Sequence, residues 1–339
     1  MISITSEEQA DSPAQLIRGN FDLIIVGASW DLRCQSILAC RELYTENAVI
    51  LAYRNKGRTG RSADSLKLLR EFFRRAVASR THVVEMESAD MIGSWTVLRE
   101  CVVETYSALG RPLRIAIDLS SVPRYVSLGL LGFCTRSGTA SQVTYWYTAA
   151  ARYEVEHEGG AVIDNYQFTV GRWLPQPIPA LSRPTSGGRP MHLIVSAGIE
   201  GPLIRRMVED LEPAMLSMLY AVNNQNEVSE KARSENRALE QSFLLSPDDS
   251  VDLPLFSTAS VVSTLGGLLD RYQIDPQGRE VEHSLLVSGA KPHALAFAIA
   301  ACEYDVKNVF FGLPEARREV TGVGLGPFYR CDLRMPLVG

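Results

Sequence analysis

A lysine and a histidine stand directly before an apolar helical pattern in SGAKPHALAFAIAA, residues 288–301. The positive end of a helix dipole repels both side chains when they are charged, so a bound anion would explain Lys291 and His293 there. Ser288 and Gly289 form a small-residue turn that lets a ligand approach backbone N–H groups. His293 can also serve as an acid or base near neutral pH. A surface lysine beside a partly packed histidine is the simpler alternative.

A second candidate turn is GASWDLR, residues 27–33, which follows an apolar strand pattern and opens a helical one. It lacks the G-x-G-x-x-G spacing that lets a pyrophosphate approach the backbone, so we do not expect NAD or FAD bound in the usual way. Arg33 can bind a phosphate or carboxylate bidentately, beside Asp31 and Ser29. The alternative is that Asp31 only caps the helix and Arg33 is solvated.

A third candidate turn, SSVPR, offers an anion or a ribose the hydroxyls of Ser120 and Ser121 and the guanidinium of Arg124. Ordinary capping by either serine, with Pro123 in the first helical turn, explains all of these residues except Arg124.

The fourth candidate turn, SAGIEGPLIRR, contributes Glu200 and Arg205. Glu200 can bind ribose hydroxyls, as an acidic residue does in nucleotide-binding folds, or it can pair with Arg205. The glycine-rich stretch 321–330 lacks the lysine and threonine of a phosphate-binding loop, and we expect a flexible turn that folds over the second pocket.

These turns require a fold that brings strand ends together. Short β-branched or aromatic runs alternate with segments whose apolar residues recur every three or four positions, which is typical of strands and helices. The predicted strands are 21–27, 48–53, 81–86, 113–120 and 142–148, and then 191–198, 214–222, 283–289 and 306–313. This alternation predicts an α/β protein of two tandem Rossmann-like units with mainly parallel sheets, whose ligands bind beyond the carboxyl ends of the strands.

The domain organisation follows from the same pattern. The stretches 115–147 and 283–313 share a strand, a small-residue turn, a proline, a helix and an aromatic strand, as copies of one unit would. A polar segment near 223–250 is expected to form a solvated helix or an inserted arm. The expected parts are a polar N-terminal arm (1–20), a first unit (21–172), a Pro/Gly-rich linker (173–190) and a second unit (191–339).

Composition limits the function classes. The 339 residues are 46% hydrophobic and 22% charged, as in a globular protein. The sequence has no apolar run of about 18 residues and no leader-like N-terminus, so we expect a cytoplasmic protein with no membrane span. Six scattered cysteines and five histidines form no metal-binding motif, and we expect reduced thiols, no metal and no cofactor. The net charge of −5 argues against strong non-specific nucleic-acid binding but permits a local basic pocket.

The segment LLVSGAKPHALAFAIAA resembles the strand, turn, lysine and helix of CARF domains, the CRISPR-associated Rossmann-fold sensors with a G-T-K-like turn. IAIDLSSVPRYVSLGLL resembles a second copy with Arg124 in place of the lysine. The resemblance implies a pseudo-two-fold pair of units that binds cyclic or linear oligonucleotide second messengers. Ala290 replaces the hydroxyl residue of the family, which removes one expected phosphate contact. The implied ligand contacts are Ser288, Gly289, Lys291, Ser120, Ser121 and Arg124.

We therefore expect a binding or sensor subunit for a nucleotide-type anion that acts through a partner effector protein, in prokaryotic antiviral defence. A nucleotide-processing enzyme of glycosidase, phosphodiesterase or transferase type is the alternative, with Asp31, Glu200 or His293 as acid or base. Binding is favoured over catalysis because the sequence shows no Ser-His-Asp order and no paired carboxylates. A third alternative is a ligand-free scaffold subunit whose contact surfaces are the polar segment 223–242 and the linker.

Overall fold

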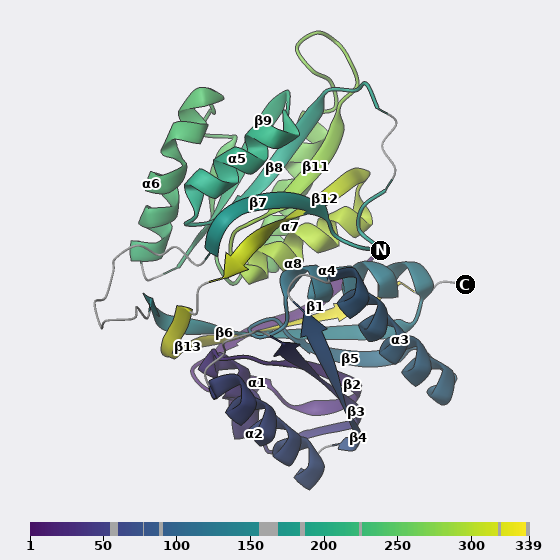
Figure 1. The fold of residues 1–339 in the computed structure, drawn as a ribbon. Helices are drawn as coiled ribbons and strands as arrows, with labels where there is room; N and C mark the ends of the chain where they lie inside the picture. Colours follow the sequence, from purple (N-terminus) through teal and green to yellow (C-terminus); the bar gives the residue numbers. More distant parts are fainter. Residues whose placement is uncertain are drawn as a thin grey trace. The chain divides into compact units, whose positions relative to one another are not determined.

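The computed structural model describes residues 1–54, 60–76, 78–87, 91–155, 169–183, 187–223, 226–317 and 320–336. The chain divides into two compact units (Figure 1). Unit 1 comprises Met1–Ile163 and Glu319–Gly339, and unit 2 comprises Asp164–Arg318.

Unit 1 is built on a seven-stranded sheet in the order β1-β13-β6-β5-β2-β3-β4. The five strands from β2 to β6 are parallel, and β2 lies between β3 and β5, so the strand order reverses between β2 and β5. The strands are β1 (Ser3–Ala10), β2 (Gly19–Ala28), β3 (Leu43–Arg54), β4 (Ala78–Glu87), β5 (Leu113–Asp118), β6 (Ala140–Val155) and β13 (Val320–Arg334). The helices are α1 (Pro13–Leu16), the 3₁₀ helix η1 (Leu32–Ala39), α2 (Arg61–Ala76), α3 (Met91–Leu109) and α4 (Arg124–Ser137).

Unit 2 repeats this plan in a six-stranded sheet of order β10-β9-β8-β11-β12-β7. Its five strands from β8 to β12 are parallel, and the order reverses between β8 and β11. The strands are β7 (Thr169–Pro177), β8 (Met191–Ala197), β9 (Met215–Val222), β10 (Ser250–Pro254), β11 (Glu282–Val287) and β12 (Val306–Arg317). The helices are α5 (Gly201–Leu211), α6 (Asn226–Ser242), α7 (Thr258–Arg271) and α8 (Lys291–Glu303).

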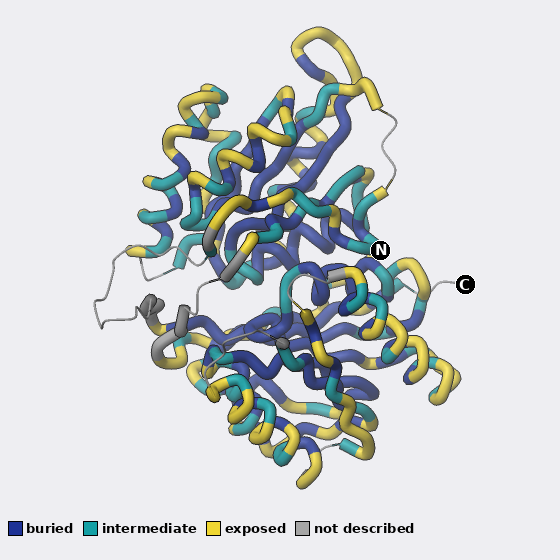
Figure 2. Tube along the Cα trace, in the orientation of Figure 1, coloured by how far each residue is buried: buried dark blue, intermediate teal, exposed yellow. Residues whose placement is uncertain are grey.

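The cores lie along the central parallel strands. The last eight residues of β2 and all six residues of β11 are buried, because parallel strands covered by helices on both faces have little exposed surface (Figure 2). Helices such as α2 alternate between buried and exposed residues. The predicted α/β fold of two tandem Rossmann-like units is confirmed, while the pseudo-two-fold arrangement of the units stays a prediction.

Three expectations about the ends of the chain and the linker were wrong. Residues 1–20 contain strand β1, which pairs antiparallel with β13, instead of forming only a polar arm. Residues 321–330 belong to β13, which pairs with β6 of unit 1, so they do not form a turn over the second pocket. The expected linker 173–190 starts inside β7, which pairs with β12. A polar sequence suits an edge strand, because its backbone hydrogen bonds need no apolar side chains.

The polar segment near 223–250 forms a regular helix of unit 2 and not an inserted arm. Residues Asn226–Ser242 form the crossover helix α6 between β9 and β10, and this helix buries Ala232, Asn236 and Leu239. Residues Ser250–Pro254 then form β10, which the sequence did not reveal because SVDLP carries few apolar residues. Among the described residues, no helix is long and apolar enough to cross a membrane.

Candidate functional site

The predicted site residues lie at the carboxyl edge of each parallel sheet. In unit 1 they follow β2 and β5, and in unit 2 they follow β8 and β11, which are the strand pairs where the order reverses. Ligands of doubly wound sheets bind beyond this edge. The turn after β5 and the turn after β11 are here called the unit 1 turn (Asp118–Arg124) and the unit 2 turn (Val287–Lys291).

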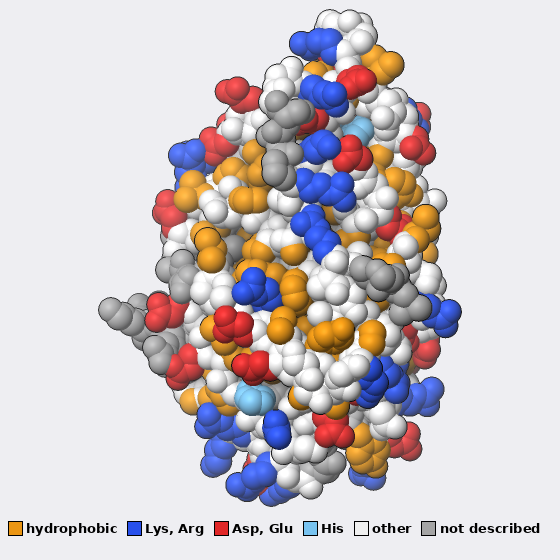
Figure 3. Space-filling view, turned by 90° about the vertical axis from the view of Figure 1, so that its right-hand side faces the viewer, with side chains coloured by type: hydrophobic (Ala, Val, Ile, Leu, Met, Phe, Trp, Pro, Cys, Tyr) orange, Lys and Arg blue, Asp and Glu red, His pale blue; other side chains and the backbone are white. Residues whose placement is uncertain are grey.

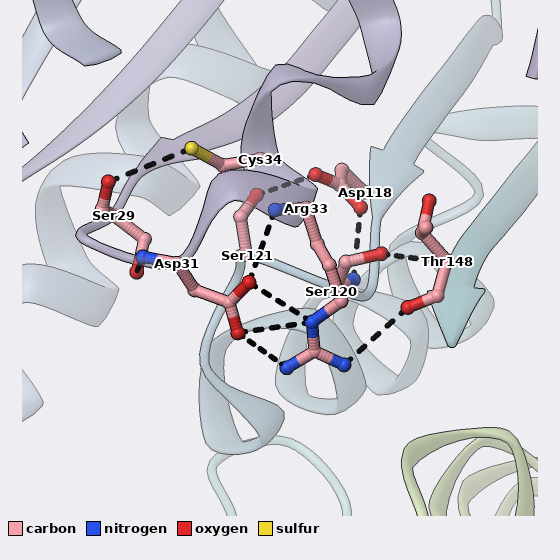
Figure 4. Close-up of polar contacts among 8 residues, drawn as sticks. All are labelled: Ser29, Asp31, Arg33, Cys34, Asp118, Ser120, Ser121 and Thr148. Atoms are coloured by element: carbon pink, nitrogen blue, oxygen red, sulfur yellow. Dashed lines mark hydrogen bonds and ion pairs between the residues drawn. The ribbon is translucent and has the colours of Figure 1, made fainter. Parts of the chain in front are cut away.

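The unit 1 turn is organised by Asp118, the last residue of β5. Its carboxylate is fully buried and accepts a hydrogen bond of 2.8 Å from Ser120 N and one of 2.5 Å from Ser121 Oγ (Figure 4). Sequence analysis missed this residue, although an aspartate at the end of the apolar strand LRIAID was a visible signal. A buried carboxylate must be satisfied by such donors, so Asp118 sets the shape of the turn.

The two predicted serines hold the unit 1 turn against neighbouring backbone. Ser121 Oγ accepts a hydrogen bond of 2.8 Å from Gly27 N, and Ser120 Oγ accepts one of 2.7 Å from Thr148 N. Gly27 has no room for a side chain, because a Cβ there would lie 2.5 Å from Ser121 O. Both hydroxyls thus tie strand ends together. The N-cap residue of α4 is Pro123 and makes no side-chain capping bond, so the structure does not show the capping role of the alternative, and the ligand contacts of the two serines stay a prediction.

Asp31 and Arg33 form an ion pair beside this turn. Arg33 Nη2 lies 2.6 Å from Asp31 Oδ2, Arg33 Nε bonds to both carboxylate oxygens, and Nη1 donates to Thr148 O at 3.3 Å (Figure 4). Asp31 also caps η1 by accepting from Arg33 N, and Ser29 Oγ accepts from Asp31 N. Each side chain of the pair is 11% exposed. Arg124 begins α4 and is partly buried.

The unit 2 turn approaches the end of β8 very closely. Ser288 Oγ donates a hydrogen bond of 2.7 Å to Ser196 O. A Cβ at Gly289 would lie 2.5 Å from Ser196 Oγ, and one at Gly198 would lie 2.7 Å from Ser288 O. Among the described residues, the buried Ser196 hydroxyl has no hydrogen-bond partner. Glycine is required at positions 198 and 289, because the turn after β8 and the unit 2 turn approach each other too closely for a side chain.

Lys291 is the first residue of α8, as predicted, and Ala290 is its N-cap residue in an extended conformation. Lys291 is partly buried, and the first turn of α8 holds no acidic side chain. The first N–H groups of a helix have no partner within the helix, and they attract an anion together with the positive end of the dipole.

His293 is engaged with the backbone of β10, and its expected contact with an anion stays a prediction. The side chain is fully buried, and its Nε2 lies 3.0 Å from the carbonyl oxygen of Pro254 at the end of β10. Burial lowers the pKa of His293 to about 4. The imidazole is therefore neutral at pH 7, and it joins α8 to β10 by donating to the carbonyl.

Glu200 and Arg205 do not pair with each other. Glu200 Oε1 accepts a hydrogen bond of 2.6 Å from Thr169 Oγ1, which in turn accepts one from Trp173 Nε1. Arg205 is exposed and pairs with Glu209 at 2.8 Å within α5. Glu200 therefore lies beside the turn after β8, whereas Arg205 points away from it.

Asn236 of α6 is a second residue that sequence analysis missed. Its buried Nδ2 donates to Gly198 O at 2.8 Å and to Ala232 O at 2.7 Å. The visible signal was an asparagine on the buried face of α6, four residues after Ala232 and three before Leu239. Its contact with Gly198 joins α6 to the turn after β8.

The described residues contain no group of three or more His, Cys, Asp or Glu side chains that could hold a metal ion. Burial raises the pKa of Cys34 to about 11 and that of Cys40 to about 12, so both thiols stay protonated at pH 7.

No family model matches the sequence, and no curated protein matches it. Among solved structures, a putative universal stress protein from Pseudomonas aeruginosa UCBPP-PA14 is similar over 86% of this chain and 92% of its own. The two share 11% sequence identity at a TM-score of 0.22. A likeness at this score carries no argument about function.

Proposed function

We propose that this protein is a binding or sensor subunit that recognises a nucleotide-type anionic ligand at the unit 2 turn. The observation that carries the proposal is the backbone contact between Gly289 and Ser196 directly before Lys291 and the N-terminus of α8. Gly289 has no side chain and its neighbours Ser288 and Ala290 have small ones, which suits the approach of a phosphate to backbone N–H groups, and the lysine adds a positive charge.

The acid and base candidates of the enzyme alternative are all engaged in other contacts. Asp31 pairs with Arg33, Glu200 accepts a hydrogen bond from Thr169, and His293 is buried with a pKa of about 4. Catalysis at neutral pH needs a group whose pKa lies near the operating pH and whose polar atoms reach the substrate. These contacts favour binding over turnover.

Binding alone changes nothing in a cell, so the proposal assigns the output to a partner effector protein. A cyclic oligonucleotide as the ligand and a role in antiviral defence stay predictions that depend on the resemblance to CARF domains. The unit 1 turn is the weaker candidate for a second ligand contact, because Arg33 would first have to leave Asp31.

The test is a thermal-shift screen of nucleotides and cyclic oligonucleotides on the wild type, Lys291→Ala and Lys231→Ala. Lys231 is the matched control, since it is a partly exposed lysine in α6 of the same unit that pairs with Glu235. Ligand at about 100 times its Kd stabilises a protein by about 2.7 kcal/mol. We expect Lys291→Ala to weaken binding about tenfold or more, because it removes a charge-assisted hydrogen bond.

The outcomes separate the three functions. A ligand that stabilises the wild type and the control but not Lys291→Ala supports the proposal. Turnover of that ligand over hours would instead support the enzyme. If no compound shifts the melting temperature, the sensor proposal fails and the scaffold alternative is favoured.

A further inference from the structure

Unit 1 carries a basic cavity at the amino edge of its sheet, opposite the candidate turns. The cavity has a volume of about 590 Å³ and lies where β2, β3, β4 and β5 begin. Four arginines line it, from the end of α2 and from the start of β5: Arg74, Arg75, Arg111 and Arg114. This concentration of positive charge is unusual in a chain with a net charge of −5.

Two of these arginines are paired, Arg111 with Asp22 and Arg75 with Glu71, so the carboxylates neutralise only part of the positive charge. Asp22 accepts hydrogen bonds of 2.7 and 2.9 Å from the Arg111 guanidinium and one of 2.8 Å from Arg114 N. Glu46 accepts one from Ser79 Oγ. Burial raises the pKa of Asp22, but the bonds from Arg111 and Arg114 N outweigh it and hold the pKa below its ordinary value. Asp22 therefore stays ionised and positions Arg111 at the cavity.

The guanidinium groups of Arg74 and Arg114 are exposed and make no hydrogen bond or ion pair to any other described residue. Arg74 also ends a row on α2 that begins with Lys67 and Arg70, here called the basic row. Its members are exposed and lie on one helix face, three and four positions apart, over about 10 Å of helix. Basic side chains gather at the lower end of the view in Figure 3, over unit 1.

Helix stability explains only part of this charge. Arg74 and Arg75 lie in the last turn of α2, where cations interact favourably with the dipole. That effect does not reach Lys67 and Arg70 in the middle of the helix, nor Arg114 on β5. A single small anion could not contact the whole row either, whereas a chain of phosphates could.

An aromatic side chain completes the surface. Tyr44, the second residue of β3, lines the cavity and is 56% exposed. Unpaired bases stack on such rings, and the energy depends little on base identity. We propose that the cavity and the basic row form a binding surface for single-stranded nucleic acid, separate from the turns of the proposed function.

The test measures the anisotropy of a labelled oligothymidine of about 15 nucleotides, with salt varied from roughly 50 to 200 mM. The variant Arg74→Ala/Arg114→Ala removes two phosphate contacts. Since each contact to a single strand contributes about 0.7 to the salt slope, we expect the slope to fall by about 1.4. Arg206→Ala/Arg237→Ala is the matched control, with the same charge loss from exposed arginines of α5 and α6.

Tyr44→Ala gives a second measurement, with an expected loss of affinity of at least about fivefold and an unchanged salt slope. Tyr44→Phe keeps the ring and should bind like the wild type. Lys291→Ala should also bind the strand normally, which keeps this test independent of the nucleotide screen. The proposal would be overturned if the two arginine double variants lost affinity equally. It would also be overturned if a duplex of the same length bound more tightly, or if the wild type did not bind at the lowest salt.

Discussion

The unit 1 turn and the unit 2 turn occupy the same place in one fold and differ at the residue that ends the strand before the turn. Pro123 and Pro292 both follow the last strand residue by five positions, from 118 to 123 and from 287 to 292. That strand residue is Asp118 in unit 1 and Val287 in unit 2. In unit 1 a carboxylate gathers the donors of the turn, whereas in unit 2 the Ser288 hydroxyl holds the turn by donating to Ser196 O.

This difference separates a turn closed by a buried carboxylate from the turn that we propose as an anion site. The Asp118 carboxylate already supplies negative charge within the unit 1 turn, so we expect an external anion to gain less there. Where the strand ends in Val287, that residue contributes no negative charge to the turn. The proposed anion binding therefore depends on the absence of a carboxylate at position 287 as well as on Lys291.

The largest expected effect comes from removing the carboxylate of unit 1. Asp118→Ala leaves Ser120 N and Ser121 Oγ without their buried acceptor, and we expect a loss of about 3 kcal/mol in the free energy of unfolding. Chemical denaturation measures it. Asp118→Asn keeps one acceptor oxygen and should cost less. A loss below about 1 kcal/mol for the alanine variant would contradict the organising role of Asp118.

Acid should weaken unit 2 before unit 1. His192 and His283 are buried on neighbouring strands with their Nδ1 atoms 3.3 Å apart, and His192 Nε2 lies 2.9 Å from Ser217 Oγ. Burial, aided by the charge of His283, lowers the pKa of His192 from 6.5 to about 3. The unfolded chain binds the proton more readily, so stability is lost as pH falls below 6.5, by about 2 kcal/mol at pH 5.

Hydrogen exchange of peptides from β8 and β11, compared with peptides from β2 and β5, measures this difference. In unit 1 the pKa values of Asp22 and Asp332 are held below 3.8 by bonds from arginines, which outweigh the effect of burial. The contribution of Asp22 and Asp332 to the stability of unit 1 is therefore lost only as the pH falls below about 3.8. His192→Asn should flatten the response of unit 2 between pH 6.5 and 5, and equal acid sensitivity in both units would refute the assignment.

The smallest expected change tests the backbone contact of the unit 2 turn. Gly289→Ala places a Cβ against Ser196 Oγ and Ala197 O, and we expect a cost of about 1–2 kcal/mol together with loss of any ligand-induced thermal shift. Gly267→Ala in α7 is the control, because no atom lies within 4 Å of its Cβ position. It should stabilise the helix by up to about 1 kcal/mol. Equal melting temperatures for the two variants would refute the close approach.

The fold was predictable where side chains alone determine an element. The central strands β2, β3, β8 and β11 contain the apolar runs LIIV, AVILA, LIV and LLV, which are typical of buried parallel strands. Strands β1 and β10 escaped prediction because edge strands are defined by backbone pairing with a distant partner. Likewise the 3₁₀ helix η1 ends at Ala39 and β3 begins at Leu43, so the predicted strand 48–53 is only the second part of β3.

The candidate site was predictable only where a residue acts within its own turn. Lys291 at the start of α8 and the Asp31 cap both follow from local sequence. The contact of His293 with Pro254 joins residues 39 positions apart, and the contact of Asn236 with Gly198 joins residues 38 apart. No spacing within a turn encodes such contacts, because the sheet order decides which segments meet.

The pairing of β1 with β13 has a consequence for how the protein is made. Ser3 pairs with Arg334, so the two neighbouring strands at one side of the unit 1 sheet are far apart in the sequence, with all of unit 2 between them. During synthesis unit 2 leaves the ribosome complete and can fold at once, whereas unit 1 must wait for β13 while β6 presents an unpaired edge. Folding of unit 1 should therefore be the slow, late step, and the waiting edge is where a chaperone or a wrong partner would bind.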